Sequence, residues 1–227
     1  MKLATKQLTI LLTLVCLTLS SQSWSADKRI GIIVFDGVLT SDITAPIEVF
    51  GIASRKSWFS DYETITINVG ESDSITTEEG LTLKVDAYLR DRPEVDVLLL
   101  PSSYDMDPLL ENEALISYIK NTATQAEWMA SNCSGALLLA EAGVLDGRNA
   151  TTWAGGESGM ARNYPEVKVQ YDRNYVIDSS ADNGNVITSN GSVVSYEAAL
   201  VLLSQLSSQD KAEEVKTALQ MQRVWRD

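Results

Sequence analysis

Apolar and amphipathic stretches alternate along most of the chain, and this alternation predicts strands that alternate with helices. Three runs, residues 29–35, 95–100 and 128–131, are apolar almost throughout, as strands buried on both faces of a sheet must be. Shorter strand-like runs occur at residues 64–69, 81–86, 150–153, 167–170, 175–179 and 186–189. We expect the run at 81–86 to be an antiparallel or edge piece. The order of elements predicts an α/β fold with a mostly parallel central sheet.

Helical patterns lie between these strands. The first helix opens at Asp42, where Thr44 and Pro46 add start signals. Further helices are expected after Cys133 and at residues 107–122, 158–164, 192–206 and 210–225, with a hairpin-like turn at residues 182–185. Because no repeat or linker interrupts the pattern, we expect one domain over residues 27–208. Residues 209–227 should form a C-terminal helix packed on that domain or at a dimer interface.

The first 26 residues have the pattern of a cleavable signal peptide. Two lysines form a basic start, residues 8–19 are largely apolar, and residues 20–26 supply small residues for cleavage after Ser25 or Ala26. The apolar run is too short and too weakly anchored to be a preferred membrane span, although a retained anchor is the alternative. We therefore expect a periplasmic or secreted protein.

Charge and cysteine content narrow the function classes. Lys2 and Lys6 leave with the signal peptide, so 18 basic side chains become 16 against 31 acidic ones, a formal charge of −15. Nucleic acid and anionic membranes are therefore not expected partners. Cys16 also leaves, so Cys133 has no cysteine to pair with inside the mature chain. The sequence has no histidine, which excludes a Cys–His couple, and we expect neither metal nor cofactor.

Cys133 stands where an apolar run meets a helix-forming run. The two small residues after it allow a tight strand-to-helix turn. The positive end of the following helix favours a thiolate, which predicts an acidic and nucleophilic cysteine. The alternative is a buried cysteine that packs as a small hydrophobic residue.

Three segments together resemble a known family. They are residues 35–50, with D-I-T-A-P-I-E-V-F at their end, residues 131–152, which begin S-N-C-S-G-A-L-L-L-A-E-A-G, and residues 187–191, I-T-S-N-G. With these segments, the sequence resembles the ThiJ/PfpI superfamily over roughly residues 29–205. The resemblance implies a three-layer, flavodoxin-like sandwich of the class I glutamine amidotransferase-like type, and a homodimer.

The resemblance also implies roles for two residues. Cys133 stands at the position of the family's nucleophile, at a strained elbow, and Asp42 stands at the position of the acidic residue beside the sulfur. An aspartate there is typical of isocyanide hydratases and of the ligand domains of some transcription regulators. A carboxyl group close to a thiolate should become protonated and donate a hydrogen bond to the sulfur. The alternative is that Asp42 only caps its helix.

The chain departs from the family pattern around this cysteine. Ser102 and Ser103 stand where relatives carry Gly-Gly, whose amides help form an oxyanion hole. Trp153 replaces a common histidine and is expected to line the pocket or the core. Ser134 can offer its amide and hydroxyl to a developing anion, or it caps the next helix. Asn132 is polar where small or apolar residues are common.

These features favour a small-molecule enzyme without histidine, a hydratase or C–N hydrolase that uses Cys133 and Asp42. The alternative is a catalytically degenerate module on the same scaffold, which binds a ligand or senses redox stress.

Overall fold

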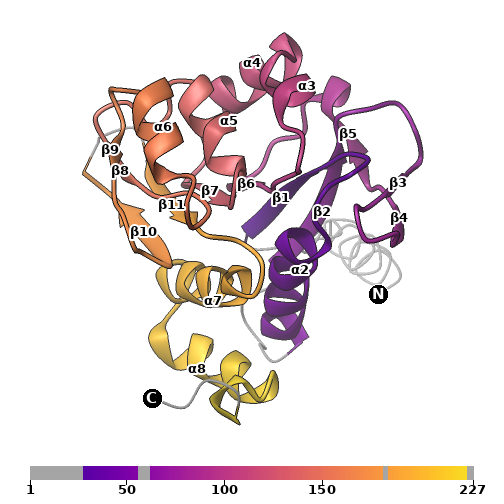
Figure 1. Ribbon diagram of the computed structural model, residues 1–227. Coiled ribbons are helices and arrows are strands. Elements are labelled where there is room, and N and C mark those ends of the chain that lie inside the picture. The colour runs from indigo at the N-terminus through magenta and orange to yellow at the C-terminus, as the bar shows by residue number, and fades with distance from the viewer. Residues whose placement is uncertain (1–27, 56–61, 181–183, 224–227) are drawn as a thin grey trace, which may run out of the picture.

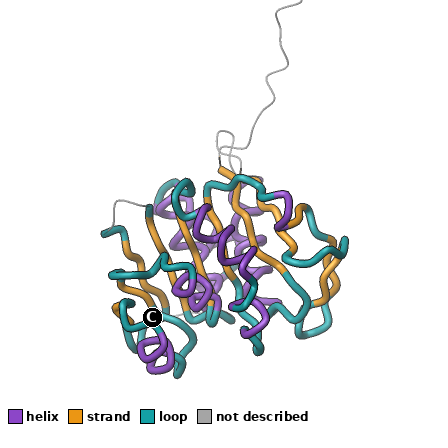
Figure 2. Tube along the Cα trace, turned by 90° about the horizontal axis from the view of Figure 1, so that it is seen from above, coloured by secondary structure: helices purple, strands orange, loops and turns teal. Residues whose placement is uncertain are grey.

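A seven-stranded sheet crosses the centre of the molecule (Figures 1 and 2). The computed structural model describes residues 28–55, 62–180 and 184–223, so the predicted signal peptide and part of the predicted 182–185 turn lie outside the described residues. In sheet order the strands are β10 (Tyr175–Asp178), β11 (Asn185–Ser189), β7 (Trp128–Asn132), β6 (Val97–Leu100), β1 (Lys28–Val34), β2 (Tyr62–Asn68) and β5 (Ala87–Tyr88). Within the described residues, the β10–β11 pair is the antiparallel one and the other neighbours in this sheet are parallel.

Helices cover both faces of this sheet and give three layers (Figure 1). One group is α2 (Thr40–Arg55), α7 (Val194–Leu206) and α8 (Gln209–Ala218), and the other is α3 (Asp107–Leu110), α4 (Glu113–Thr122), α5 (Gly135–Glu141) and α6 (Glu157–Asn163). The predicted α/β sandwich with a mostly parallel sheet is therefore confirmed.

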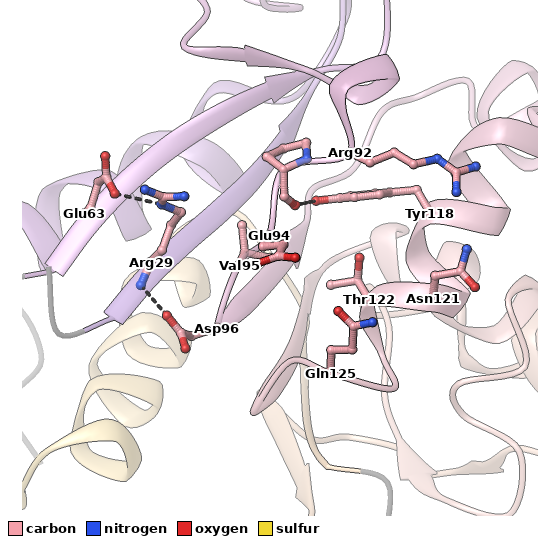
Figure 3. Close-up of a pocket in the computed structure, with 11 residues that line it drawn as sticks. Arg29, Glu63, Arg92, Glu94, Val95, Asp96, Tyr118, Asn121, Thr122 and Gln125 are labelled. Carbon is pink, nitrogen blue, oxygen red and sulfur yellow. Dashed lines mark hydrogen bonds and ion pairs between the residues drawn. The ribbon is translucent and has the colours of Figure 1, made fainter. Parts of the chain in front are cut away.

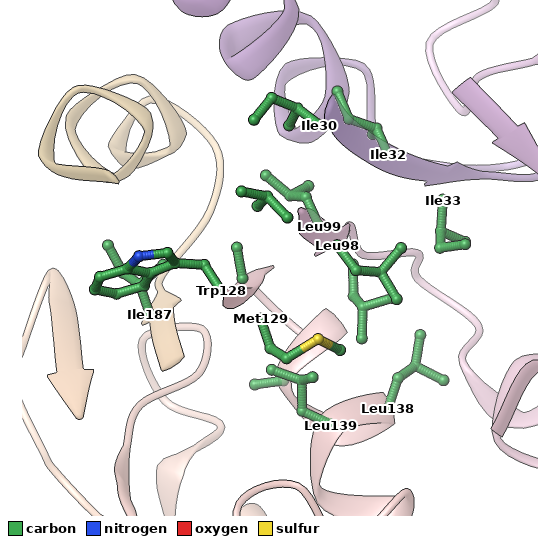
Figure 4. Packing of buried hydrophobic residues seen from close by; sticks show 14 of the residues in the cluster. Ile30, Ile32, Ile33, Leu98, Leu99, Trp128, Met129, Leu138, Leu139 and Ile187 are labelled. Carbon is green, nitrogen blue, oxygen red and sulfur yellow. The ribbon is translucent and has the colours of Figure 1, made fainter. Parts of the chain in front are cut away.

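The core lies between the sheet and the two helix layers. All four residues of β6 are buried, because helices cover both of its faces. Figure 4 shows part of this cluster, in which Ile30, Leu98 and Met129 come from neighbouring strands and Leu138 comes from α5. Burial on both faces explains why these strands read as continuous apolar runs in the sequence.

One predicted helix differs from the structure, and one predicted strand has the antiparallel pairing expected of it. The helix expected over residues 107–122 is split into α3 and α4, because Asn112 has an extended backbone and its side chain accepts a hydrogen bond from the Leu115 amide. The run at 81–86 contains β4 (Thr82–Lys84), which pairs antiparallel with β3 (Ser74–Thr76) outside the main sheet.

A second small sheet lies near the candidate site. β8 (Asn149–Ala150) pairs with β9 (Lys168–Val169), where the sequence predicted short strands.

The C-terminal region packs on the domain. Ala212 and Val215 of α8 are buried, and α8 contacts α7 and α2. The predicted helix at 210–225 instead ends at Ala218, and a short 3₁₀ turn follows at Met221–Arg223. No helix within the described ranges has the length and apolar character needed to cross a membrane.

Chain order brings the candidate residues to one edge of the sheet. β6, β7 and β11 are parallel neighbours, so their carboxyl ends lie together. Ser102 follows β6, Cys133 follows β7, and Gly191 follows β11, while Asp42 comes from the first turn of α2.

Candidate functional site

Cys133 occupies the turn between β7 and α5 in a left-handed backbone conformation, with φ of 52°. A non-glycine residue in this region costs about 1–3 kcal/mol and persists only where its surroundings fix it. Its amide donates to the Ser189 carbonyl at 2.8 Å, and the Thr152 hydroxyl donates to the Cys133 carbonyl at 2.9 Å. The turn is therefore held by hydrogen bonds from both sides, and its thiol is half-buried.

Glycines allow the backbone to pass very close to this turn. A Cβ on Gly191, whose φ is +78°, would lie 2.5 Å from the Cβ of Cys133 and 2.9 Å from Oδ1 of Asp42. A Cβ on Gly135 would lie 2.1 Å from the carbonyl oxygen of Leu100. Both positions therefore require glycine, Gly191 beside Cys133 and Asp42, and Gly135 against the backbone at the end of β6.

Asp42 is fully buried, and each of its carboxylate oxygens accepts hydrogen bonds. Oδ1 accepts from the Ser192 amide and the Ser195 hydroxyl, both at 2.9 Å. Oδ2 accepts from the Ser102 hydroxyl at 2.5 Å and from the Ser102 amide at 3.2 Å. Burial raises the pKa of Asp42, while these hydrogen bonds oppose the rise.

Ser102 lies between the carboxylate and the thiol. Its hydroxyl donates to Oδ2 of Asp42 and also forms a side-chain hydrogen bond with Cys133. None of the hydrogen bonds described for Asp42 joins its carboxyl group to the sulfur. The sequence predicted a direct bond from a protonated Asp42 to the sulfur; in the structure the serine takes that position.

The Cys133 thiol is less acidic than the sequence predicted, because its pKa is raised. Burial raises its pKa and the nearby charge of Asp42 raises it further, while hydrogen bonds with Ser102 and Ser134 lower it. The predicted acidic thiol is therefore wrong for the resting site. The reason is that burial of the thiol outweighs the hydrogen bonds with Ser102 and Ser134.

Ser134 uses its side chain on the site rather than as a helix cap. No side-chain capping bond forms at the start of α5, and the Ser134 hydroxyl instead donates to the Ser103 carbonyl at 3.2 Å. The amide and hydroxyl of Ser134 both form hydrogen bonds with Cys133. Ser103 is half-buried, and its hydroxyl accepts from the Asp105 amide at 3.3 Å. An oxyanion-binding role for Ser103 and Ser134 remains a prediction.

Trp153 is half-buried next to Thr152. Its indole packs against Gly156, where a Cβ would come within 2.2 Å of the ring. The chain thus connects Trp153 to the Cys133 turn through the Thr152 hydrogen bond, and a direct role in the pocket stays a prediction.

Three residues around Asp42 had no role assigned from the sequence. Ser192 and Ser195 follow β11 and supply both donors to Oδ1 of Asp42. Asn132, noted only as an unusual polar residue, donates to the Asp42 carbonyl at 3.0 Å and accepts from the Ser189 hydroxyl at 2.7 Å. The signal that could have located the two serines was their position at the carboxyl end of a buried strand.

A separate pocket of about 630 Å³ lies at the opposite edge of the sheet (Figure 3). Arg29 at the start of β1 donates to Glu63 at the start of β2 at 2.7 Å, and its amide donates to Asp96 just before β6 at 2.7 Å. Because these are the amino ends of parallel strands, this pocket is remote from Cys133. Arg29, Glu63 and Asp96 in its wall are paired with one another, and we assign the pocket no chemistry.

Among the described residues, no group of three or more acidic or cysteine side chains is placed to hold a metal ion. The side chains gathered at the carboxyl edge are a thiol, a buried carboxyl group and several serine hydroxyls.

The fold and site define an α/β sandwich with a cysteine at a left-handed turn after a central parallel strand. Residues 28–205 match the DJ-1/PfpI family, and the chain belongs to that family.

Relatives within this family extend the comparison. A protein described as isonitrile hydratase from Pseudomonas putida is 30% identical over 195 residues, which are 85% of this chain and 78% of that protein. The crystal structure of a ThiJ/PfpI family protein from Pseudomonas syringae has a TM-score of 0.73 at 22% identity, covering 89% of this chain and 78% of that one. An AraC family transcriptional regulator from Pseudomonas putida has a TM-score of 0.70 at 17% identity, covering 85% of this chain and 99% of that one. These two structural likenesses show the fold alone.

Proposed function

We propose that this protein is a small-molecule hydratase or C–N hydrolase in which Cys133 is the nucleophile and Asp42 manages the proton. The observation that carries the proposal is the conformation of Cys133. Its backbone has a φ of 52°, and its half-buried thiol forms hydrogen bonds with Ser102 and Ser134. A strained cysteine supported by polar groups on several sides is typical of a nucleophile, because packing alone needs no such support. The similarity to an isonitrile hydratase supports the hydration of an isonitrile as the first reaction to test.

The groups present can account for such a hydration. The Cys133 thiolate adds to the terminal carbon of R–NC, and a proton is delivered to that carbon, giving a thioimidate, R–N=CH–S–Cys133. Water then adds to the same carbon, the C–S bond breaks, and the product is R–NH–CHO with the thiol restored. Asp42 holds and returns the proton in this cycle. The Ser134 amide would stabilise charge at the reacting carbon and sulfur, and its hydroxyl would do so after turning away from the Ser103 carbonyl.

The raised pKa of the thiol is compatible with this cycle. Burial keeps the resting Cys133 as a neutral thiol, so the nucleophile forms only when a nearby base accepts its proton. Asp42 is buried beside it and can be that base.

The test is turnover of a panel of alkyl and aryl isonitriles, with formamide formation followed by chromatography. We expect Cys133→Ala to lower the rate by at least on the order of 10³-fold and Asp42→Asn by roughly 10²-fold. Asp86→Asn is a matched control, since Asp86 accepts two hydrogen bonds from Thr66 away from this edge. Unchanged turnover in both site variants would contradict the proposal.

The raised thiol pKa also favours a second candidate, a module that binds a ligand without turnover. In that case a ligand would raise the Tm of the native protein and of Cys133→Ala equally. Redox sensing is less favoured, because oxidation starts from the thiolate, which burial disfavours here. A mass gain of two oxygens after mild peroxide treatment would restore it.

A further inference from the structure

Ser102 connects the two titratable groups of the site through one hydroxyl. It is fully buried, two residues after the end of β6, and its Oγ lies 2.5 Å from Oδ2 of Asp42. The same hydroxyl forms a hydrogen bond with Cys133. A serine hydroxyl has a single proton, so while it donates to Asp42 it can only accept from the S–H group. The resting arrangement is therefore S–H to Oγ, and Oγ–H to Oδ2. The hydroxyl donates to the thiolate, and so lowers the pKa of the thiol, once Asp42 carries a proton.

The two oxygens of Asp42 are not equivalent in this arrangement. Oδ1 receives its hydrogen bonds from Ser192 and Ser195. Oδ2 receives both of its hydrogen bonds from Ser102. The hydrogen-bonded route from the sulfur to this carboxyl group thus passes through the Ser102 hydroxyl and ends on Oδ2.

We propose that Ser102 is a catalytic proton relay between Cys133 and Asp42, an inference that rests on the proposed function of this site. The S–H bond of Cys133 breaks as its proton moves to Oγ of Ser102, and the Oγ–H proton moves to Oδ2 of Asp42. The thiol and carboxylate become a thiolate and a carboxylic acid, and the serine keeps one proton. Oδ2–H then donates to Oγ, and Oγ–H donates to the sulfur, so the relay also stabilises the thiolate.

The relay makes the reactivity of Cys133 depend on Ser102 and Asp42 jointly. A donor that merely contacts the sulfur would act whether or not Asp42 can accept a proton. A relay needs the acceptor, so removing Asp42 should remove most of the effect of Ser102. A double-mutant cycle separates the two cases.

The experiment measures the rate constant for alkylation of Cys133 by iodoacetamide at pH 7. We expect Ser102→Ala to slow alkylation about tenfold, equivalent to about one pKa unit in the thiol. In the Asp42→Asn background, the same substitution should change the rate by less than about twofold. Ser131→Ala is the matched control, because Ser131 is a buried serine on β7 whose hydroxyl has no hydrogen-bond partner described; it should leave the rate unchanged.

Two results would overturn the relay: no slowing in Ser102→Ala, or an equal or larger slowing in the Asp42→Asn background. Ser102→Gly provides a second variant without the hydroxyl if Ser102→Ala does not fold, and thermal unfolding checks each protein. Because alkylation needs no substrate, the relay can hold even if no isonitrile is turned over, and that result would reject the proposed function alone.

Discussion

At Gly191 the chain passes close to both Cys133 and the carboxyl group of Asp42, and no side chain fits there. A Cβ would lie 2.5 Å from Cys133 and 2.9 Å from Asp42, and the φ of +78° disfavours any L side chain. We expect Gly191→Ala to lower the free energy of unfolding by about 3 kcal/mol through overpacking and backbone strain. Urea unfolding followed by fluorescence measures this.

Gly80 supplies the control for backbone strain alone. Its φ is +90°, and a Cβ there would meet no described atom within 4 Å. Gly80→Ala should therefore cost only about 1 kcal/mol. Equal losses in the two variants would show that the close approach at Gly191 contributes nothing.

Sequence reasoning reached some residues of the site and missed others for a physical reason. Cys133 stands in a contiguous stretch whose pattern shows a strand, a turn and a helix, and Asp42 was reached through a motif resemblance. Ser192 and Ser195 lie about 150 residues from Asp42 in the chain, and only the folded sheet brings them to it. The direction of the Cys133 pKa shift was wrong, because the sequence showed the helix but not the burial.

Helices and strands could be predicted where the hydrophobic periodicity of the sequence is enough to define them. The continuous apolar strands and the long helices α2 and α7 follow directly from pattern. The break between α3 and α4 was missed, because an apolar stripe runs through both and the cap depends on the single side chain of Asn112. The separate β3–β4 hairpin was only partly anticipated, since short strands carry little periodicity.

Asp178 ties the edge strand β10 to β8. Its carboxylate accepts from the amide and side chain of Asn149, both at 2.8 Å, and from the amide of Ser180 at 3.0 Å. Burial would raise the pKa of Asp178, but the hydrogen bonds from Ser180 and Asn149 outweigh it and hold the pKa well below its usual range.

The sign of this shift sets a pH dependence. Because the folded state lowers the pKa of Asp178, its stabilisation is present above the unfolded value of about 3.9 and is lost as the pH falls toward the folded value. Asp178→Asn should therefore reduce the free energy of unfolding by about 2 kcal/mol at pH 7. The deficit should shrink below about pH 4. Urea unfolding at several pH values tests this, with exposed Asp146→Asn as control; a deficit that does not change with pH would contradict it.

At the scale of the whole molecule, one topological fact organises the site. Parallel neighbours β6, β7 and β11 deliver Ser102, Cys133 and Gly191 to one edge, and α2 adds Asp42. The polar pocket at the opposite edge shares none of these residues. The α/β order predicted that Asp42, Ser102 and Cys133 would lie at one edge, because the carboxyl ends of parallel strands lie together.

Export would determine whether the Cys133 thiol lies in the cytoplasm or in the periplasm or medium. The basic start, the apolar run at 8–19 and the small residues up to Ala26 lead us to propose a cleaved signal peptide and a periplasmic or secreted protein. Expressed from its full sequence in a bacterium, the protein should be recovered from the periplasm or medium with an intact mass that begins at Ala26 or Asp27. It should bind one equivalent of a thiol reagent after unfolding, because Cys16 has left with the signal.

Leu11→Arg interrupts the apolar run and should leave the full-length protein inside the cell. A native protein that keeps Met1, or that stays in the cytoplasm like this variant, would refute export.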